Sequence, residues 1–156
     1  MKTLIAYATK HGAALEIARQ IAGKTDGSVL YDLKQGGLLS IDEFDCIIVG
    51  SSVYAGMIRK EAKAFLSQNA DLLRSKRLGL FYSGMDPSRE KDTLEANFPA
   101  DILQAAKSAR FLGGIFDPEK AGFLERLIMK AASKQTGYAN NIDAVKIELF
   151  IEELWA

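Results

Sequence analysis

The segment Thr9–Ala14 combines a hydroxyl, a lysine, a histidine and a glycine directly after a short apolar run, Leu4–Ala8. Apolar residues then recur at helical spacing, so a helix is expected to begin at this segment. The first backbone N–H groups of a helix lack intrahelical partners and carry positive partial charge, which predicts a phosphate-binding loop. The loop has one glycine and no Gly-Lys-Ser/Thr, so it matches neither the Walker A motif nor the dinucleotide fingerprint. The sequence of this loop therefore disfavours a binding site for ATP or NAD.

Two further segments combine glycine with hydroxyl or other polar side chains, Ser51–Gly56 and Ser83–Glu90. They follow the short apolar runs Cys46–Val49 and Leu78–Tyr82, which are typical of buried parallel strands. In an open parallel sheet, ligands bind outside the carboxyl ends of the strands. The three loops are therefore expected to form one site.

Strand and helix patterns alternate along the chain. The expected strands are Leu4–Ala8, Val29–Leu33, Cys46–Val49, Leu78–Tyr82 and Phe111–Ile115, and the expected helices follow Gly12 and cover Arg59–Leu73, Thr93–Ala109, Glu119–Gln135 and Asn141–Leu154. Asp117-Pro118 is typical of an N-cap followed by proline at the first helical position. This alternation predicts an α/β fold with a doubly wound, five-stranded parallel sheet, in one domain over residues 1–156.

Composition restricts the class of protein. The 156 residues are 48% hydrophobic and 26% charged, and 20 Lys plus Arg balance 20 Asp plus Glu, so nucleic acid is not an expected partner. The single cysteine, Cys46, excludes an internal disulfide and a metal site of several thiolates, and it suits a cytoplasmic protein. We expect no metal. The apolar run before Thr9 is too short for a secretory signal, and no run reaches the roughly 18 residues of a membrane helix.

The three loops together follow a known pattern. Thr9–Ala14 is similar to the flavodoxin motif Thr/Ser-x-x-Gly-x-Thr, and Gly50–Gly56 and Ser83–Asp86 continue the likeness. The chain resembles the flavodoxin-like family over essentially its whole length, which implies the strand order 2-1-3-4-5. It is most similar to the branch that includes the menaquinone-dependent protoporphyrinogen oxidase, on the basis of Met1–Ile5, Val49–Ser52 and Phe123–Lys130.

This resemblance implies non-covalently bound FMN, with its phosphate on the first loop and its ring on the other two. The implied cofactor-binding residues are Thr9, Lys10, His11, Gly12, Ala13, Ala14, Ser51, Ser52, Val53, Tyr54, Ala55, Gly56, Ser83, Gly84, Met85 and Asp86. Tyr54 would stack on the ring, and Asp86 would oppose its anionic reduced form. Implied partners are a redox protein, or a quinone or porphyrinogen-like small molecule.

The chain departs from the family pattern in three ways. Ala14 stands where a threonine usually binds the phosphate. Lys10 and His11 could compensate with positive charge in a loop that the family usually keeps neutral, and no second aromatic residue is evident near Pro87. No acid, base or nucleophile constellation is evident, so we assign no catalytic residue. His11 is expected to act in the phosphate loop or to lie on the surface. Cys46 is expected to be an inert residue of the core.

Two functional classes remain open. The first is an FMN oxidoreductase, either a protoporphyrinogen-type dehydrogenase that uses a quinone or a plain electron-transfer flavodoxin. The second is a flavodoxin-shaped binding or regulatory domain without flavin. The resemblance also implies an inserted helical segment at about 117–138. Its amphipathic stretch 119–135 could dock a partner or contact a membrane peripherally, but we favour packing on the sheet or on a second subunit, as in a homodimer.

Overall fold

A parallel sheet lies at the centre of the computed structural model, which describes residues 1–37, 40–133 and 137–156. In this described part of the chain the parallel strands are β1 (Thr3–Ala8), β2 (Ser28–Asp32), β3 (Cys46–Tyr54), β5 (Arg77–Ser83) and β6 (Ser108–Phe111). Their order is β2-β1-β3-β5-β6. The predicted fold and the order 2-1-3-4-5 are confirmed, because the extra strand β4 (Met57–Ile58) pairs only with the end of β3, antiparallel to it.

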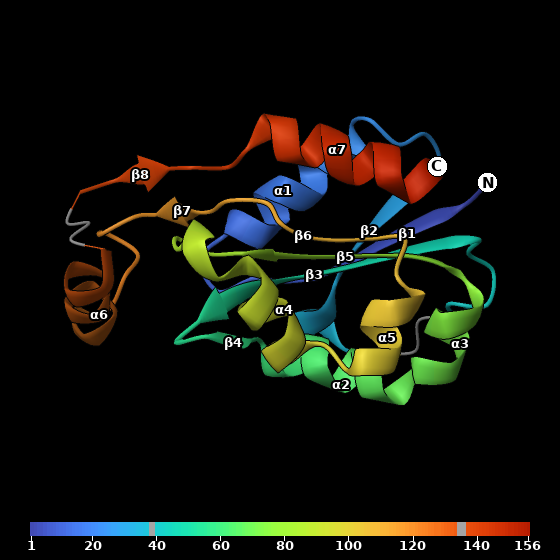
Figure 1. Ribbon diagram of the computed structural model, residues 1–156, viewed down its shortest axis with the longest axis horizontal. Helices are drawn as coiled ribbons and strands as arrows, with labels where there is room; N and C mark the ends of the chain where they lie inside the picture. Colours follow the sequence, from blue (N-terminus) through green and yellow to red (C-terminus); the bar gives the residue numbers. More distant parts are fainter. Residues whose placement is uncertain (38–39, 134–136) are drawn as a thin grey trace.

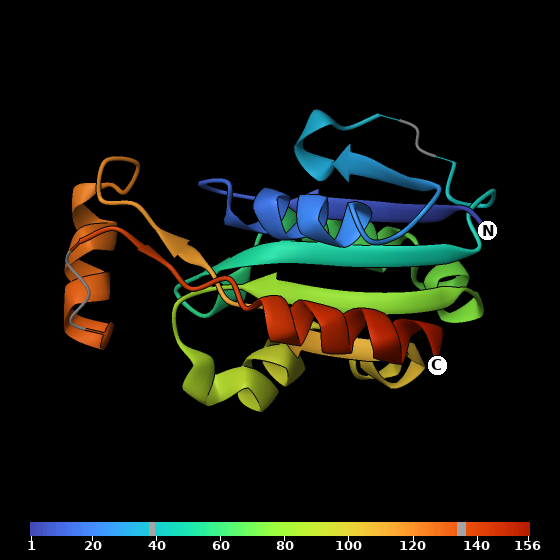
Figure 2. The ribbon, with the colours of Figure 1, turned by 90° about the horizontal axis from the view of Figure 1, so that it is seen from above.

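Helices cover both faces of the sheet, as Figures 1 and 2 show. One face carries α1 (Ala13–Ala22) and α7 (Ala144–Trp155), and the other carries α2 (Lys60–Gln68), α3 (Ala70–Ser75), α4 (Glu90–Asn97) and α5 (Ala100–Ala105). Single 3-10 turns lie at Leu33–Gln35 and Pro87–Arg89. Successive strand residues point to opposite faces, so Leu4 and Ile5 enter separate hydrophobic clusters, and both are fully buried. This double burial explains the continuous apolar runs.

The third strand is longer than predicted. Val53 and Tyr54 pair with β4, so only Ala55 and Gly56 form a turn. The prediction of a loop over the whole of Ser51–Gly56 is therefore wrong. Its first four residues belong to β3, because the hairpin supplies hydrogen-bond partners beyond the end of the parallel ladder.

Two other predicted boundaries also need correction. The expected helix Thr93–Ala109 is two helices, α4 and α5, because Pro99 interrupts the hydrogen-bond ladder and lies at the N-cap of α5. The fifth strand is Ser108–Phe111, and it ends where the predicted strand Phe111–Ile115 was expected to begin. Ser108 and Arg110 make this strand polar, so its sequence lacks the apolar run that predicts a buried strand.

The segment between the sheet and α7 forms an arm. It leaves along β7 (Ile115–Phe116), passes through α6 (Phe123–Ser133) and returns along β8 (Ala139–Asn140), which pairs antiparallel with β7. Figure 1 shows α6 beyond the carboxyl ends of the parallel strands, apart from the helices that cover the sheet. We call residues 115–140 the arm. Packing of α6 on the sheet is therefore wrong, whereas packing on a second subunit stays a prediction.

The predicted start of the arm helix is also wrong. The Asp117 carboxylate accepts the N–H of Glu119 at 3.0 Å, and the Asp117 carbonyl accepts the N–H groups of Lys120 and Ala121. These bonds form a separate turn, which competes with helix formation at this point. The helix begins only at Phe123, and residues 134 and 135 of the predicted helix lie outside the described residues.

A charged contact fixes α7 to the edge strand β6. The Glu153 carboxylate accepts hydrogen bonds from Ser108 Oγ at 2.6 Å and from Arg110 Nε at 2.9 Å. The Arg110 guanidinium holds the pKa of Glu153 below its ordinary value of 4.5, against the opposing effect of burial. A carboxylate with a lowered folded-state pKa stabilises the fold above its unfolded pKa, and this contribution is lost as pH falls through the folded value.

We therefore expect Glu153→Gln to lower the free energy of unfolding by about 1 kcal/mol at pH 7, since the pair is partly exposed. The difference from wild type should shrink as the pH falls below 4.5. Urea unfolding between pH 7 and pH 3 measures it. Glu152→Gln, in the same helix turn at an exposed position, is the control and should change little. A loss that is independent of pH would contradict this account.

Candidate functional site

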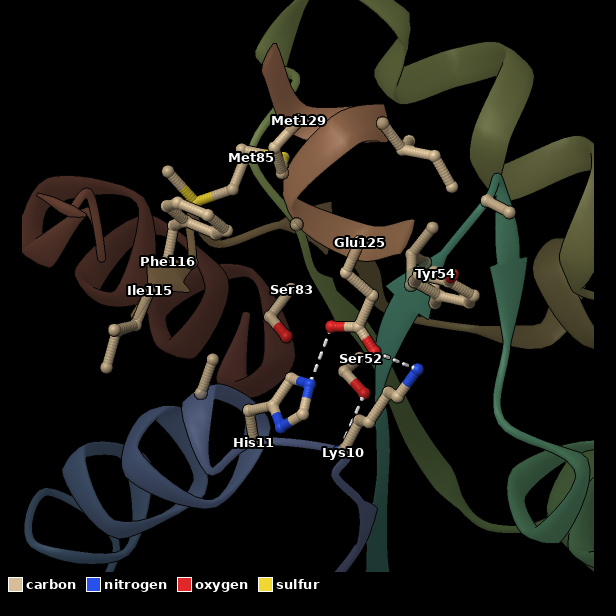
Figure 3. A pocket seen from close by; sticks show the side chains of 16 residues that line it. Lys10, His11, Ser52, Tyr54, Ser83, Met85, Ile115, Phe116, Glu125 and Met129 are labelled. Atoms are coloured by element: carbon tan, nitrogen blue, oxygen red, sulfur yellow. Dashed lines mark hydrogen bonds and ion pairs between the residues drawn. The ribbon is translucent and has the colours of Figure 1, made fainter. Parts of the chain in front are cut away.

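The carboxyl ends of β1, β3 and β5 meet at a cavity of about 150 Å³, which we call the loop cavity. Figure 3 shows its side chains. The lining residues come from the three predicted loops and from the arm: Lys10, His11, Ala13, Ser52, Val53, Tyr54, Ala55, Ser83, Gly84, Met85, Gly114, Ile115, Phe116, Glu125, Ile128 and Met129. The sequence-based expectation that the three loops come together at one edge of the sheet agrees with this geometry.

A second, larger cavity of about 650 Å³, the outer cavity, adjoins the first. The two share Val53, Ala55, Gly84, Met85, Ile128 and Met129. The outer cavity also reaches Gly56, Tyr82, Asp86 and the first turn of α4. Ile128 and Met129 of α6 therefore stand where the two cavities meet.

The first loop is built as an uncapped helix start. Gly12 has φ +101°, a left-handed conformation that disfavours other residues, and its carbonyl accepts the first helical hydrogen bond from Glu16 N–H at 3.0 Å. The N-cap residue, Gly12, has no side chain that could cap α1. Thr9 Oγ1 accepts the Gly12 N–H at 2.9 Å, and Ser52 Oγ accepts the Lys10 N–H at 3.1 Å, which fixes the loop to β3. This geometry leaves the helix N-terminus available to an anion.

The second loop is a tight hairpin turn between β3 and β4. Ala55 and Gly56 both have positive φ, at +50° and +78°. Asn97 of α4 holds this turn: its side-chain oxygen accepts the Ile58 N–H at 2.8 Å, and its side-chain nitrogen donates to the Gly56 carbonyl at 2.8 Å. The Ser51 hydroxyl is used internally, since it accepts the Arg59 N–H at 2.9 Å. The turn is thus fixed from two sides.

The third loop carries a buried hydroxyl without a partner. Ser83 is 1% exposed, its Oγ makes no hydrogen bond within the described residues, and it lines the loop cavity. The next residue, Gly84, donates its N–H to the Gly113 carbonyl at 3.1 Å. Asp86 lies farther out, where its carboxylate accepts the N–H and the hydroxyl of Ser88. These bonds to Ser88 hold the pKa of Asp86 below its ordinary value.

An acidic residue of the arm reaches into the site. The Glu125 carboxylate forms an ion pair with Lys10 Nζ and lies 2.7 Å from His11 Nε2, within hydrogen-bond distance (Figure 3). Lys10 Nζ also lies 3.7 Å from the centre of the Tyr54 ring. Burial tends to raise the pKa of Glu125, but hydrogen bonds and charges from Lys10 and His11 outweigh burial and lower it. The carboxylate is therefore held in its charged form.

Residues 4–143 match the model of the flavodoxin domain. The chain belongs to the flavodoxin domain family. Solved structures give the same fold. The chain is similar to rubredoxin oxygen:oxidoreductase from Desulfovibrio gigas, with 16% identity and a TM-score of 0.57, over 99% of this chain and 37% of that one. No curated protein matches the chain significantly.

Two other solved structures are close in size to this flavodoxin domain. A short-chain flavodoxin associated with a non-canonical PDU bacterial microcompartment has 19% identity and a TM-score of 0.55, with 76% of this chain and 86% of that one covered. A putative flavoprotein from Bacteroides eggerthii has 15% identity and a TM-score of 0.50, with coverage of 83% and 96%. At these identities the comparisons establish the fold alone.

The predicted site residues of this flavodoxin domain do not all line the same cavity. Ten line the loop cavity, and Gly56 and Asp86 line the outer cavity. Thr9 lines a separate small cavity with Lys10, Lys34 and Arg59. Gly12 sets the loop conformation, while the side chains of Ala14 and Ser51 are buried away from the surface. Ala14 can therefore offer a ligand only its backbone.

Sequence reasoning missed Glu125 and Asn97. The contact of Glu125 with His11 joins residues 114 positions apart, and Asn97 reaches Gly56 across 41. No local pattern marks either residue, because both act through tertiary contacts.

Proposed function

We propose that this chain binds FMN at the loop and outer cavities and transfers electrons through it. The proposal rests on two features beside one cavity: a helix start whose N-cap residue is glycine, and the buried hydroxyl of Ser83, which has no hydrogen-bond partner among the described residues. A buried polar atom without a partner is costly, and a polar ligand group would satisfy it. The family to which the chain belongs supports the same cofactor.

The residues present fit FMN in charge and polarity. The backbone N–H groups of Ala13 and Ala14, with Thr9 and Lys10, would hold the phosphate. The loop cavity alone is smaller than the roughly 300–1,000 Å³ of usual ligand pockets, but the adjoining outer cavity is within that range. Tyr54 and the Ala55-Gly56 turn would bound the ring, and Ser83 would donate to or accept from its polar edge. When bound, FMN supplies one- and two-electron chemistry, and the protein sets its orientation and potential.

A protoporphyrinogen-type dehydrogenase linked to a quinone is the more specific version of this proposal. The outer cavity favours it, because apolar side chains such as Val53 and Met85 line a space beside the ring loops that a flat organic molecule could enter. Turnover of protoporphyrinogen with menaquinone tests this version. Electron exchange with a redox protein, without such turnover, would favour a plain electron-transfer flavodoxin.

The arm offers a surface for such partners. Phe123, Leu124 and Leu127 of α6 are 75%, 63% and 48% exposed, and Arg126 and Lys130 lie on the same exposed helix. This combination suits peripheral contact with a membrane, or association with a second copy of the chain. No helix in the described ranges has the length and apolar character needed to cross a bilayer. We place the protein in the cytoplasm, where the buried free Cys46 would stay reduced.

We expect the purified full-length protein to take up one FMN per chain, with quenching of flavin fluorescence and a visible absorption spectrum typical of bound flavin. Titration of the flavin-free protein with FMN, with riboflavin as the control that lacks the phosphate, measures this. Riboflavin should bind more weakly, since it cannot use the helix start of α1. Absence of any FMN uptake would instead favour the second class, a flavodoxin-shaped binding or regulatory domain.

A further inference from the structure

Charged contacts between α6 and the rest of the molecule involve Glu125. Within residues 1–37, 40–133 and 137–156, the only ion pairs that join α6 to another element are those of Glu125 with Lys10 and His11. On the opposite side of the helix, Phe123 and Leu124 are largely exposed. Ile128 and Met129 face the cavities. Among the described residues, the charged contacts of α6 are thus made with the first loop of the site.

The two side chains that Glu125 contacts, Lys10 and His11, belong to the loop that would receive the FMN phosphate. They are partly buried, with side-chain exposures of 28% for Lys10 and 34% for His11, and Glu125 is only 15% exposed. A phosphate at this loop would place a second anion beside the carboxylate, and like charges repel strongly where water is partly excluded. Lys10 Nζ also lies 3.7 Å from the centre of the Tyr54 ring and covers one of its faces. A phosphate at the first loop therefore requires this cluster to rearrange.

We propose that Glu125 is an internal anion that holds α6 over the cofactor site in the flavin-free protein, and that FMN displaces it from Lys10 and His11 and so releases the arm. This inference rests on the proposed binding of FMN. Loading and arm docking then exclude each other, and the apparent affinity for FMN is reduced by the fraction of molecules whose arm is closed. The released α6 moves away from the site together with its exposed apolar side chains. Binding of FMN therefore controls the position of this apolar surface.

Glu125→Gln removes the charge and keeps the shape of the side chain. In a fluorescence titration of the flavin-free, full-length protein, we expect its Kd for FMN to be about tenfold lower than that of wild type, within the range of roughly 5- to 150-fold for coupled binding events. Glu119→Gln is the matched control. It makes the same change of charge in the same arm, at an exposed residue whose side chain makes no contact with the loop. Its Kd should equal that of wild type.

Hydrogen exchange of residues 123–131 provides a readout that does not depend on activity. In wild type, addition of FMN should raise the exchange of this segment, and Glu125→Gln should show the raised level without FMN. Protection of α6 on FMN binding, or an FMN affinity of Glu125→Gln equal to or below that of Glu119→Gln, would overturn the inference while FMN binding itself stands. Failure of wild type and both variants to bind FMN would overturn the proposed function and, with it, the displacement of Glu125.

Discussion

Replacement of Gly113 with alanine is expected to lower the free energy of unfolding by about 3–5 kcal/mol, since it combines backbone strain with overpacking. Gly113 has φ +89°, which L side chains rarely adopt. A Cβ there would lie 2.0 Å from the Asn141 carbonyl oxygen and 2.7 Å from Ile142 Cα, and both are backbone atoms that a rotamer change cannot move. The substitution would separate the end of β6 from the segment that enters α7.

Urea unfolding of Gly113→Ala beside Gly122→Ala measures this effect. Gly122 lies in the arm, its φ is not positive, and a Cβ there would meet nothing within 4 Å, so its replacement should be nearly neutral. Gly84 donates its N–H to the Gly113 carbonyl, so the Gly113 variant should also bind FMN more weakly. Equal stability of the two variants would show that residues 112–114 and 141–142 do not approach each other this closely.

Gly12→Val is expected to weaken FMN binding on the order of 100-fold. A Cβ at Gly12 would meet nothing within 4 Å, so no collision with neighbours explains the effect. The cause is conformational, because a β-branched residue is strongly disfavoured at φ +101°. A loop that relaxes to negative φ turns its N–H groups away from the phosphate, and each lost hydrogen bond to a charged group costs about 1.5–3 kcal/mol.

The matched control is Gly12→Asn, because asparagine tolerates the left-handed conformation much better than valine. Its Kd for FMN should stay within about tenfold of wild type, since left-handed strain costs no more than about 1–2 kcal/mol. Both variants should keep the far-ultraviolet circular dichroism of the wild type, since the sheet does not depend on this loop. Similar affinities for wild type and the valine variant would contradict a phosphate site at the start of α1.

The fold could be predicted from the sequence where burial is complete. Residues 46–49 and 78–82 form strands with helices on both faces, so their sequences are continuously apolar and easy to recognise. The loops that follow such strands must lie at one edge of the sheet, and this places Lys10, Ser52 and Ser83 at the same cavity. Topology alone therefore predicts the meeting of the three loops.

The features that the sequence did not predict depend on contacts between residues far apart in the chain. β6 contains Ser108 and Arg110, which suit a buried edge only because Glu153 of α7 receives their hydrogen bonds across 45 and 43 residues. The extension of β3 depends on its hairpin with β4, whose turn is held by Asn97. In the sequence, Glu125 resembles an ordinary helix carboxylate, because its partners Lys10 and His11 lie in the first loop. Local patterns cannot contain such information.

The antiparallel pairing of β7 with β8 brings the two ends of the arm together, with Ile115 opposite Asn140 and the Asn141 N–H bonded to the Gly114 carbonyl at 2.7 Å. A chain that departs and returns at hydrogen-bonded neighbours can be lengthened, shortened or exchanged without changing the register of any parallel strand. The arm is in this sense a module whose two connections to the rest of the chain lie side by side. Selection for a new partner can act on its length and apolar surface while the five-stranded frame beneath remains the same.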